Sequence, residues 1–213
     1  MEKYGQIPKK FTAAWFDYVW EYYKWHIIAV IAIVASIVYT CYTFATRIEY
    51  DLQICFASNN FISEEAQENL ISALSEKIED VNGDGEKNIQ ILEYSVSPTN
   101  ADGQFVAAMQ TKFQLELQAS DTYLFIISKD RVDTLLGGAQ AEGLFASTSE
   151  WTTKESTDGY FIQANEGDLL SDSGIVYSDL YMTVRNHVAA VKSKNSDAFR
   201  NNAILAAKAI AGE

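Results

Sequence analysis

Residues 27–45 form an unbroken run of nineteen residues without a charged side chain. At about 1.5 Å per residue, a helix of this length spans roughly 30 Å, the thickness of the hydrocarbon core of a bilayer. A cleaved signal peptide is the alternative, but the apolar core of a signal peptide usually has only about 7 to 15 residues. The pattern therefore predicts one retained transmembrane helix over residues 27–45.

Beyond this run, segments with the alternation of a strand are followed by segments with the spacing of a helix. The run at residues 123–127 is apolar throughout, which is typical of a central strand covered on both faces. Residues 139–179 have no clear period, so they are expected to be irregular or to hold an extra hairpin. The expected strands are residues 52–56, 89–96, 123–127 and 180–184, and the expected helices start after Ser63, after residue 103, near Val132 and at the N-cap Ser196.

This order predicts an α/β domain with a mostly parallel sheet and helices on both faces, because parallel neighbours need crossover connections. The expected organisation has three parts. Residues 1–26 form a cytoplasmic tail with an aromatic interfacial segment, residues 27–45 form the transmembrane helix, and residues 46–213 form one extracellular α/β domain.

The flanks of the apolar run predict its orientation. Four lysines precede it, whereas Arg47 is the nearby cation that follows, and cation-rich flanks stay in the cytoplasm. Aromatic residues are concentrated just before the run, where amphipathic rings prefer the lipid headgroups. We expect this segment to contact the lipid bilayer, with docking against a membrane-protein partner as the alternative.

Charge and cysteine content limit the function. Residues 1–24 carry four lysines and three acidic residues, a net charge of +1, so the rest must carry −14 to give the total of −13. An anionic external domain repels nucleic acid and anionic headgroups, so nucleic acid is excluded as a partner. Cys41 lies in the apolar run and Cys55 in an expected strand, which excludes a disulfide framework.

In parallel sheets, ligands bind beyond the carboxyl ends of the strands. Those ends lead here into residues 58–60, 95–99 and 128–130, which are rich in small polar residues. This composition suits a binding crevice, and it equally suits ordinary loops and helix caps. We prefer the simpler interpretation as loops and caps.

Residues 80–88 (DVNGDGEKN) contain the sharpest local motif. Oxygen-bearing side chains at positions 1, 3 and 5, with glycine at position 6, are typical of a calcium loop. Position 12 of an EF-hand would hold a glutamate, but this position is Ile91. A solvated turn built on two Asx-Gly pairs is the competing interpretation. The residues that would hold calcium, the one cofactor considered, are Asp80, Asn82, Asp84, Glu86 and Asn88.

Other candidate chemistry has little support in the sequence. His187 has no nucleophile motif beside it and is interpreted as a surface or packing residue. Trp151, Tyr160 and Phe161 could form an aromatic platform for a sugar or peptide, but residues of this kind more often belong to a core. No metalloprotease, hydrolase or phosphate-loop motif is present in the sequence.

Two stretches resemble a known family. Residues 104–145 contain FVAAMQTKFQLELQAS, then DTYLFIIS, then DRVDTLLGGAQAEGLF, and they resemble the first lobe of extracellular solute-binding proteins of the type 2 periplasmic-binding fold. The stretch LYMTVRNHVAAVKSKNSDAFRNNAILAAKAI resembles the late strand and helix of that family. A two-lobe protein needs roughly twice this length. The resemblance therefore implies a truncated, membrane-anchored domain and assigns no ligand residues. The lead YYKWHII is similar to that of single-span membrane proteins of Gram-positive bacteria.

These observations predict a non-catalytic, single-pass membrane protein whose external domain binds a small solute or a protein partner at the cell surface. The small-molecule ligand is not identified by the sequence. An accessory subunit of a membrane complex is one alternative, and an extracellular hydrolase is a second.

The orientation is tested by adding protease to intact cells that express the chain. We expect cleavage within the segment beyond Arg47, because the lysine-rich flank keeps the N-terminus inside. Immunoblotting of the remaining fragment measures this. Protection of the domain, or a mature chain that starts after Ala45, would contradict the prediction.

Overall fold

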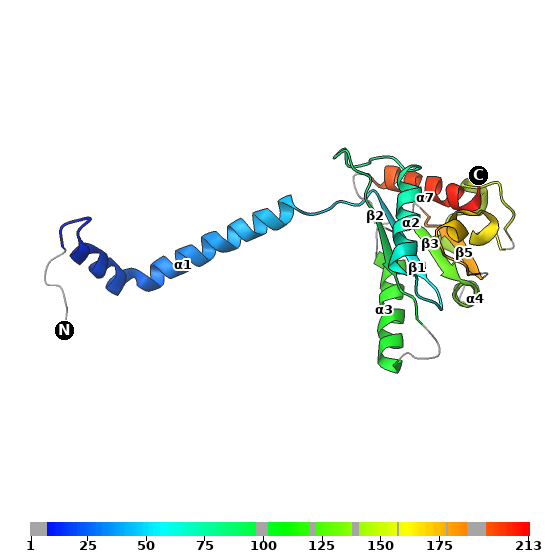
Figure 1. Cartoon of the computed structure of the whole chain (residues 1–213). Coiled ribbons are helices and arrows are strands. Elements are labelled where there is room, and N and C mark those ends of the chain that lie inside the picture. The colour runs from blue at the N-terminus through cyan, green and yellow to red at the C-terminus, as the bar shows by residue number, and fades with distance from the viewer. Residues whose placement is uncertain are drawn as a thin grey trace. The chain divides into compact units, whose positions relative to one another are not determined.

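The computed structural model describes residues 8–96, 102–119, 122–137, 141–156, 158–177, 179–186 and 195–213. The chain consists of two compact units, Met1–Ile48 and Glu49–Glu213 (Figure 1). The first unit contains one long helix, and the second contains a sheet with helices around it.

Helix α1, Ala13–Ala45, forms the body of the first unit. It is long and apolar enough to be a candidate membrane span, and none of its residues is buried. The expected interfacial segment is continuous with the span in this helix, which bends within its first half (Figure 1). The hydroxyls of Thr40 and Thr43 donate to the carbonyls of Ser36 and Tyr39, so these polar groups are paired within the helix.

The second unit is built on a five-stranded sheet with the order β2-β1-β3-β5-β4. Strand β1 is parallel to β2 and β3, whereas β5 is antiparallel to both β3 and β4. Four strands therefore run in one direction and β5 in the other, which confirms the α/β class with a mostly parallel sheet. The strands are β1 Leu52–Ala57, β2 Ile89–Glu93, β3 Leu124–Ser128, β4 Ile162–Gln163 and β5 Leu180–Val184.

Helices cover both faces of the sheet, as expected. Strand residues such as Ile54 and Phe56 pack with α2 and α7 on one face, and Cys55 and Phe125 pack with α3 and α4 on the other. The longer helices are α2 Glu64–Ser75, α3 Gly103–Ala119, α4 Lys129–Gly137 and α7 Ser196–Ala211. Short turns complete the unit: α5 Ala141–Leu144, η1 Thr148–Glu150, η2 Ala164–Glu166 and α6 Leu169–Asp172.

Local signals in the sequence located the start of one helix and missed the start of another by one residue. The Ser63 hydroxyl accepts a hydrogen bond from the Ala66 amide and caps α2, as predicted. The prediction that Ser196 is the N-cap of α7 was wrong by one residue. The first helical hydrogen bond of α7 runs from the Phe199 amide to the Asn195 carbonyl, so Asn195 is the N-cap.

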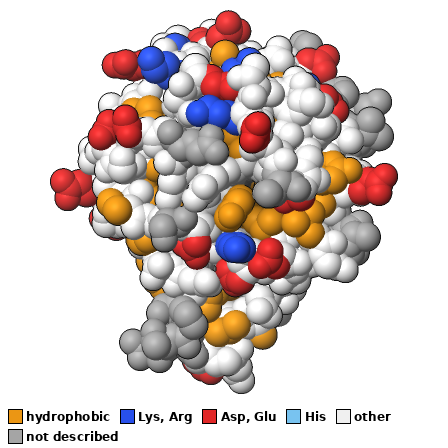
Figure 2. Space-filling model, turned by 90° about the vertical axis from the view of Figure 1, so that its right-hand side faces the viewer, with side chains coloured by type: hydrophobic (Ala, Val, Ile, Leu, Met, Phe, Trp, Pro, Cys, Tyr) orange, Lys and Arg blue, Asp and Glu red, His pale blue; other side chains and the backbone are white. Residues whose placement is uncertain are grey.

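Acidic side chains are more frequent than basic ones on the face of the second unit that Figure 2 shows, in line with the composition of the chain. Figure 2 shows Asp and Glu side chains spread over one face, with few Lys and Arg among them and hydrophobic side chains gathered in between. Both cysteines are free. Cys55 is fully buried in β1, where burial raises the pKa of its thiol well above the ordinary value.

Arg185, directly after β5, is fully buried. Its guanidinium donates to the carbonyls of Glu116, Leu117 and Thr122 at 2.7–2.8 Å, and its Cζ lies 5.0 Å from the centre of the Phe125 ring. Glu116 and Leu117 belong to the last turn of α3, where helix carbonyls lack helical partners. The positive charge therefore caps the negative end of α3 and fixes this helix against the sheet.

Replacing Arg185 by Met should lower the free energy of unfolding by about 3 kcal/mol, because buried carbonyls that pair with a charged donor would lose their partner. Urea unfolding of the full chain in detergent, followed by near-UV circular dichroism, measures this. Lys112→Met, which removes an exposed cation from the same helix, is the matched control and should change little. Equal stability of the two variants would contradict the capping role.

A close backbone contact predicts a second stability effect. A Cβ atom on Gly167 would lie 2.2 Å from the Ile210 carbonyl oxygen and 2.8 Å from the Gly212 nitrogen. Gly167→Ala should therefore cost about 1–3 kcal/mol through overpacking. Gly103→Ala, with nothing within 4 Å, should leave stability unchanged or raise it by up to about 1 kcal/mol. Thermal unfolding of both variants tests this contrast, and equal melting temperatures would refute it.

Candidate functional site

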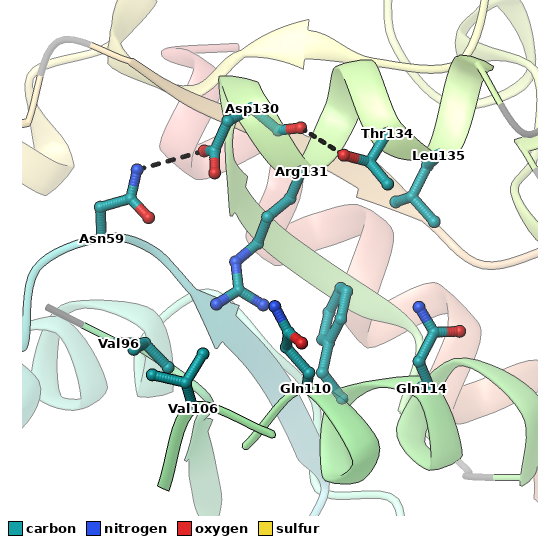
Figure 3. Close-up of a pocket in the computed structure, with 10 residues that line it drawn as sticks. Asn59, Val96, Val106, Gln110, Gln114, Asp130, Arg131, Thr134 and Leu135 are labelled. Carbon is teal, nitrogen blue, oxygen red and sulfur yellow. Dashed lines mark hydrogen bonds between the residues drawn. The ribbon is translucent and has the colours of Figure 1, made fainter. Parts of the chain in front are cut away.

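A cavity of about 580 Å³ lies between α3 and α4, beside the carboxyl ends of the three parallel strands (Figure 3). Asn59 follows β1, Val96 follows β2, and Asp130 and Arg131 stand at the start of α4, directly after β3. These are the strand ends for which the sequence left a crevice and ordinary loops as alternatives. A cavity lies at these ends, while the hydroxyls of Ser58 and Ser128 bond within their own loops, so both interpretations stay open. The remaining lining residues are Val106, Gln110, Phe113 and Gln114 from α3, with Thr134 and Leu135 from α4.

Arg131 is the cation of this cavity. Its side chain is half-buried and extends from α4 toward Gln110 (Figure 3). Its Nη2 donates to the Tyr94 carbonyl at 3.2 Å, and its Cζ lies 5.1 Å from the centre of the Phe113 ring. Burial lowers the pKa of Arg131 from its ordinary value. In the described part of the chain, no carboxylate lies within ion-pair distance of this guanidinium.

Asp130, the neighbour of Arg131, is held by other groups. Its Oδ1 accepts hydrogen bonds from Asn59 Nδ2 at 3.2 Å and from the Ser128 hydroxyl at 2.5 Å. The Thr134 hydroxyl donates to the Asp130 carbonyl at 2.8 Å (Figure 3). These bonds fix the carboxylate toward the β1 side of the cavity, beside Asn59, so it offsets the charge of Arg131 through space without a direct hydrogen bond to the guanidinium.

A hydrogen-bonded network behind the cavity connects α3, which forms one wall, to residues beside the sheet. The Tyr94 hydroxyl donates to Glu116 Oε2 at 2.9 Å, and the Thr122 hydroxyl donates to Glu116 Oε1 at 2.5 Å. Burial raises the pKa of Tyr94 well above its ordinary value, with the bond to Glu116 as a second cause. Tyr94 thus contacts Arg131 through its carbonyl and α3 through its hydroxyl, so it couples the two sides of the cavity.

The residues that the sequence offered for calcium lie in a turn that uses their oxygens. Asp80 accepts from the amides of Gly83 and Gly85 at 2.6 and 2.9 Å, and these bonds, the one from Gly85 first, lower the pKa of Asp80. Asn82 Oδ1 accepts from the Asp84 amide, and Asp84 Oδ1 accepts from the Glu86 amide, both at 2.8 Å.

Asn88 closes this turn, because its amide donates to the buried carboxylate of Asp51 at 2.9 Å. Asp51 also accepts from the amides of Val81 and Asn82, and Asn202 on α7 binds the adjoining backbone. Within the described residues, no three His, Cys, Asp or Glu side chains are grouped to suit a metal ion. Calcium binding by this loop stays a hypothesis that calorimetric titration can decide.

Other candidates are separate from the cavity. Trp151 and Phe161 are buried in two different core clusters, which confirms their interpretation as core residues, and the half-buried Tyr160 packs against the cluster of Phe161. His187 lies outside the described residues, as do the last part of the 95–99 loop and Gly138 after α4.

Sequence reasoning missed Arg131, Gln110 and Gln114. A signal for the two glutamines exists, since Val106, Gln110 and Gln114 recur every four residues and share a face of α3 beside the buried Phe113. Glutamine side chains at the edge of the apolar face of a helix are well placed to line a cavity with polar groups. Arg131 had no comparable signal, because its role depends on the contact between α4 and α3.

Comparison of the chain with known proteins identified no relative. No protein-family description, curated protein or solved structure matches the chain. The function of the cavity is therefore argued from its own residues.

Proposed function

We propose that the chain is a single-pass membrane protein whose external α/β domain binds a small ligand without transforming it. The single observation that carries the proposal is the cavity at the carboxyl ends of β1, β2 and β3. Ligands of open α/β sheets bind at this edge, because the loops there bring side chains from several strands together.

The size and lining of the cavity support a small ligand. About 580 Å³ falls within the range of roughly 300–1,000 Å³ typical of small-molecule sites. Val96, Val106 and Leu135 offer apolar contact, while Arg131 and Gln110 offer directed hydrogen bonds. A few polar groups in an otherwise apolar wall are the usual means of orienting a ligand.

The lining also favours binding over catalysis. The Thr134 hydroxyl donates to a backbone carbonyl, and the Asp130 carboxylate is held by Asn59 and Ser128. A nucleophile needs a base within hydrogen-bond reach, and Thr134 is instead bonded to a carbonyl. The Ser128 hydroxyl does bond to the Asp130 carboxylate, but it is buried and does not line the cavity. Helix α1 then serves as the tether, with the cation-rich N-terminus on the cytoplasmic side.

An accessory subunit is the second candidate, and one observation favours it. Phe61 and Val176 are exposed by 49% and 77%, and the Tyr177 hydroxyl donates to the Phe61 carbonyl at 2.9 Å, so these segments adjoin. Exposed apolar side chains that cluster can form a protein-docking surface. Such a subunit would co-purify with a partner and gain no stability from a small ligand.

Thermal unfolding of the full chain in nanodiscs with a metabolite panel tests the proposed function. A true ligand at one hundred times its dissociation constant stabilises the folded state by about 2.7 kcal/mol, which raises the melting temperature of the domain by several degrees. Val106→Trp should abolish the shift by filling the cavity, whereas Leu115→Trp, on the exposed side of α3, should preserve it. A panel with no stabilising member at millimolar concentration would contradict the proposal.

A further inference from the structure

We propose that the cavity selects small organic acids that carry one carboxylate beside an apolar group, and that Arg131 is the residue that binds the carboxylate. This inference rests on the proposed binding function and names the class of ligand. Four features of the cavity support it: an arginine with N–H donors left for a ligand, the partial burial of that arginine, the charge around it, and the apolar side chains in the lining.

The guanidinium of Arg131 is oriented for a ligand. Its Nη2 uses one N–H on the Tyr94 carbonyl, and the Phe113 ring supports its face. A guanidinium carries five N–H donors in a planar fork, so donors remain for a second, planar partner. Figure 3 shows the group extending into the space between α3 and α4 rather than toward the outside of the helix. A carboxylate matches this fork with two parallel hydrogen bonds.

The partial burial of Arg131 makes the binding of an anionic ligand more favourable. Burial disfavours the charged form and is the main cause of the lowered pKa of this group, while the nearby Asp130 carboxylate acts in the opposite direction. An anionic ligand would relieve this penalty, because the two charges would interact in a region with less water than the surface. A neutral ligand offers no such relief.

The charge around the cavity limits the ligand to one negative charge. Asp130 is adjacent to Arg131, and the chain beyond residue 24 carries a net charge of −14. A phosphate group brings about 1.5 to 2 negative charges at neutral pH and commonly needs several cations or amides to hold it. Arg131 supplies one positive charge, which the nearby Asp130 partly offsets, so each further negative charge on the ligand is less favourable and a phosphate is disfavoured relative to a carboxylate.

The apolar part of the lining determines the rest of the ligand. Val96, Val106 and Leu135 present branched apolar side chains, and the Gln110 amide lies beside the guanidinium (Figure 3). An apolar group on the ligand would bury against the branched side chains at about 25 cal/mol per Å². The ligand class is therefore a short aliphatic or aryl monocarboxylate.

The test compares matched probes on the full chain in nanodiscs. Straight-chain, branched and aryl monocarboxylates of four to nine carbons are titrated by calorimetry beside their primary amides, their phosphate analogues and acetylated dipeptides with a free carboxyl end. We expect at least one monocarboxylate to bind about tenfold or more tightly than its amide and its phosphate analogue, since a charge-assisted hydrogen bond is lost in the amide.

Variants assign the effect to Arg131. Arg131→Gln should weaken monocarboxylate binding about tenfold or more, and Arg131→Lys, which keeps the charge but loses the fork, should weaken it to a smaller extent. Lys112→Gln removes the same charge from an exposed position of α3 and should leave binding unchanged. Circular dichroism and melting temperature establish that each variant folds. If Arg131→Gln does not fold, the Lys variant and the acid–amide comparison on the unmodified chain still decide the inference.

Several outcomes would overturn it. Equal affinity for acid and amide, tighter binding of a phosphate or of a dipeptide, or unchanged monocarboxylate binding in Arg131→Gln would each refute the assignment. A ligand of another class found in the metabolite panel, without monocarboxylate binding, would refute this inference and leave the proposed function standing. Absence of any ligand would refute both.

Discussion

The position of α3, and with it one wall of the cavity, depends on a charge buried at the end of β5. Arg185 has no exposed surface, and moving a guanidinium out of water costs several kcal/mol unless partners compensate it. The compensation comes from the carbonyls of Glu116, Leu117 and Thr122 and from the Phe125 ring. Because two of these carbonyls end α3, the same contacts that solvate the charge also orient the helix.

A second arginine, in a different setting, gives the cavity its chemistry. Arg185 is surrounded by carbonyls and serves the fold, whereas Arg131 has one carbonyl and one ring beside it and keeps part of its surface open. Tyr94 connects the two regions, since its carbonyl contacts Arg131 and its hydroxyl contacts Glu116 on the helix that Arg185 caps. The structural charge and the candidate binding charge thus act on opposite ends of one hydrogen-bonded network.

The loop at residues 80–88 illustrates how one set of oxygens can support two interpretations. In the sequence, its spacing resembles a cation loop. In the structure, Asp80, Asn82 and Asp84 accept backbone amides of the same loop, and Asp51 holds the loop from inside the domain. A cation in this loop would have to share these oxygens with the backbone amides. Exposed glycines at positive φ, such as Gly83, allow the tight path of the chain that makes these bonds.

The sequence by itself determined the features that depend on neighbours along the chain. Period and length predicted the apolar helix, β1, the buried central strand β3 and the cap of α2 at Ser63, because side-chain spacing and capping are local. Tertiary structure alone decided the direction of β5, the burial of Arg185 and the meeting of Asn59, Val96 and Arg131 at one cavity. Such contacts join residues far apart in the chain, and no local pattern specifies which distant partner will satisfy a buried charge or close a sheet.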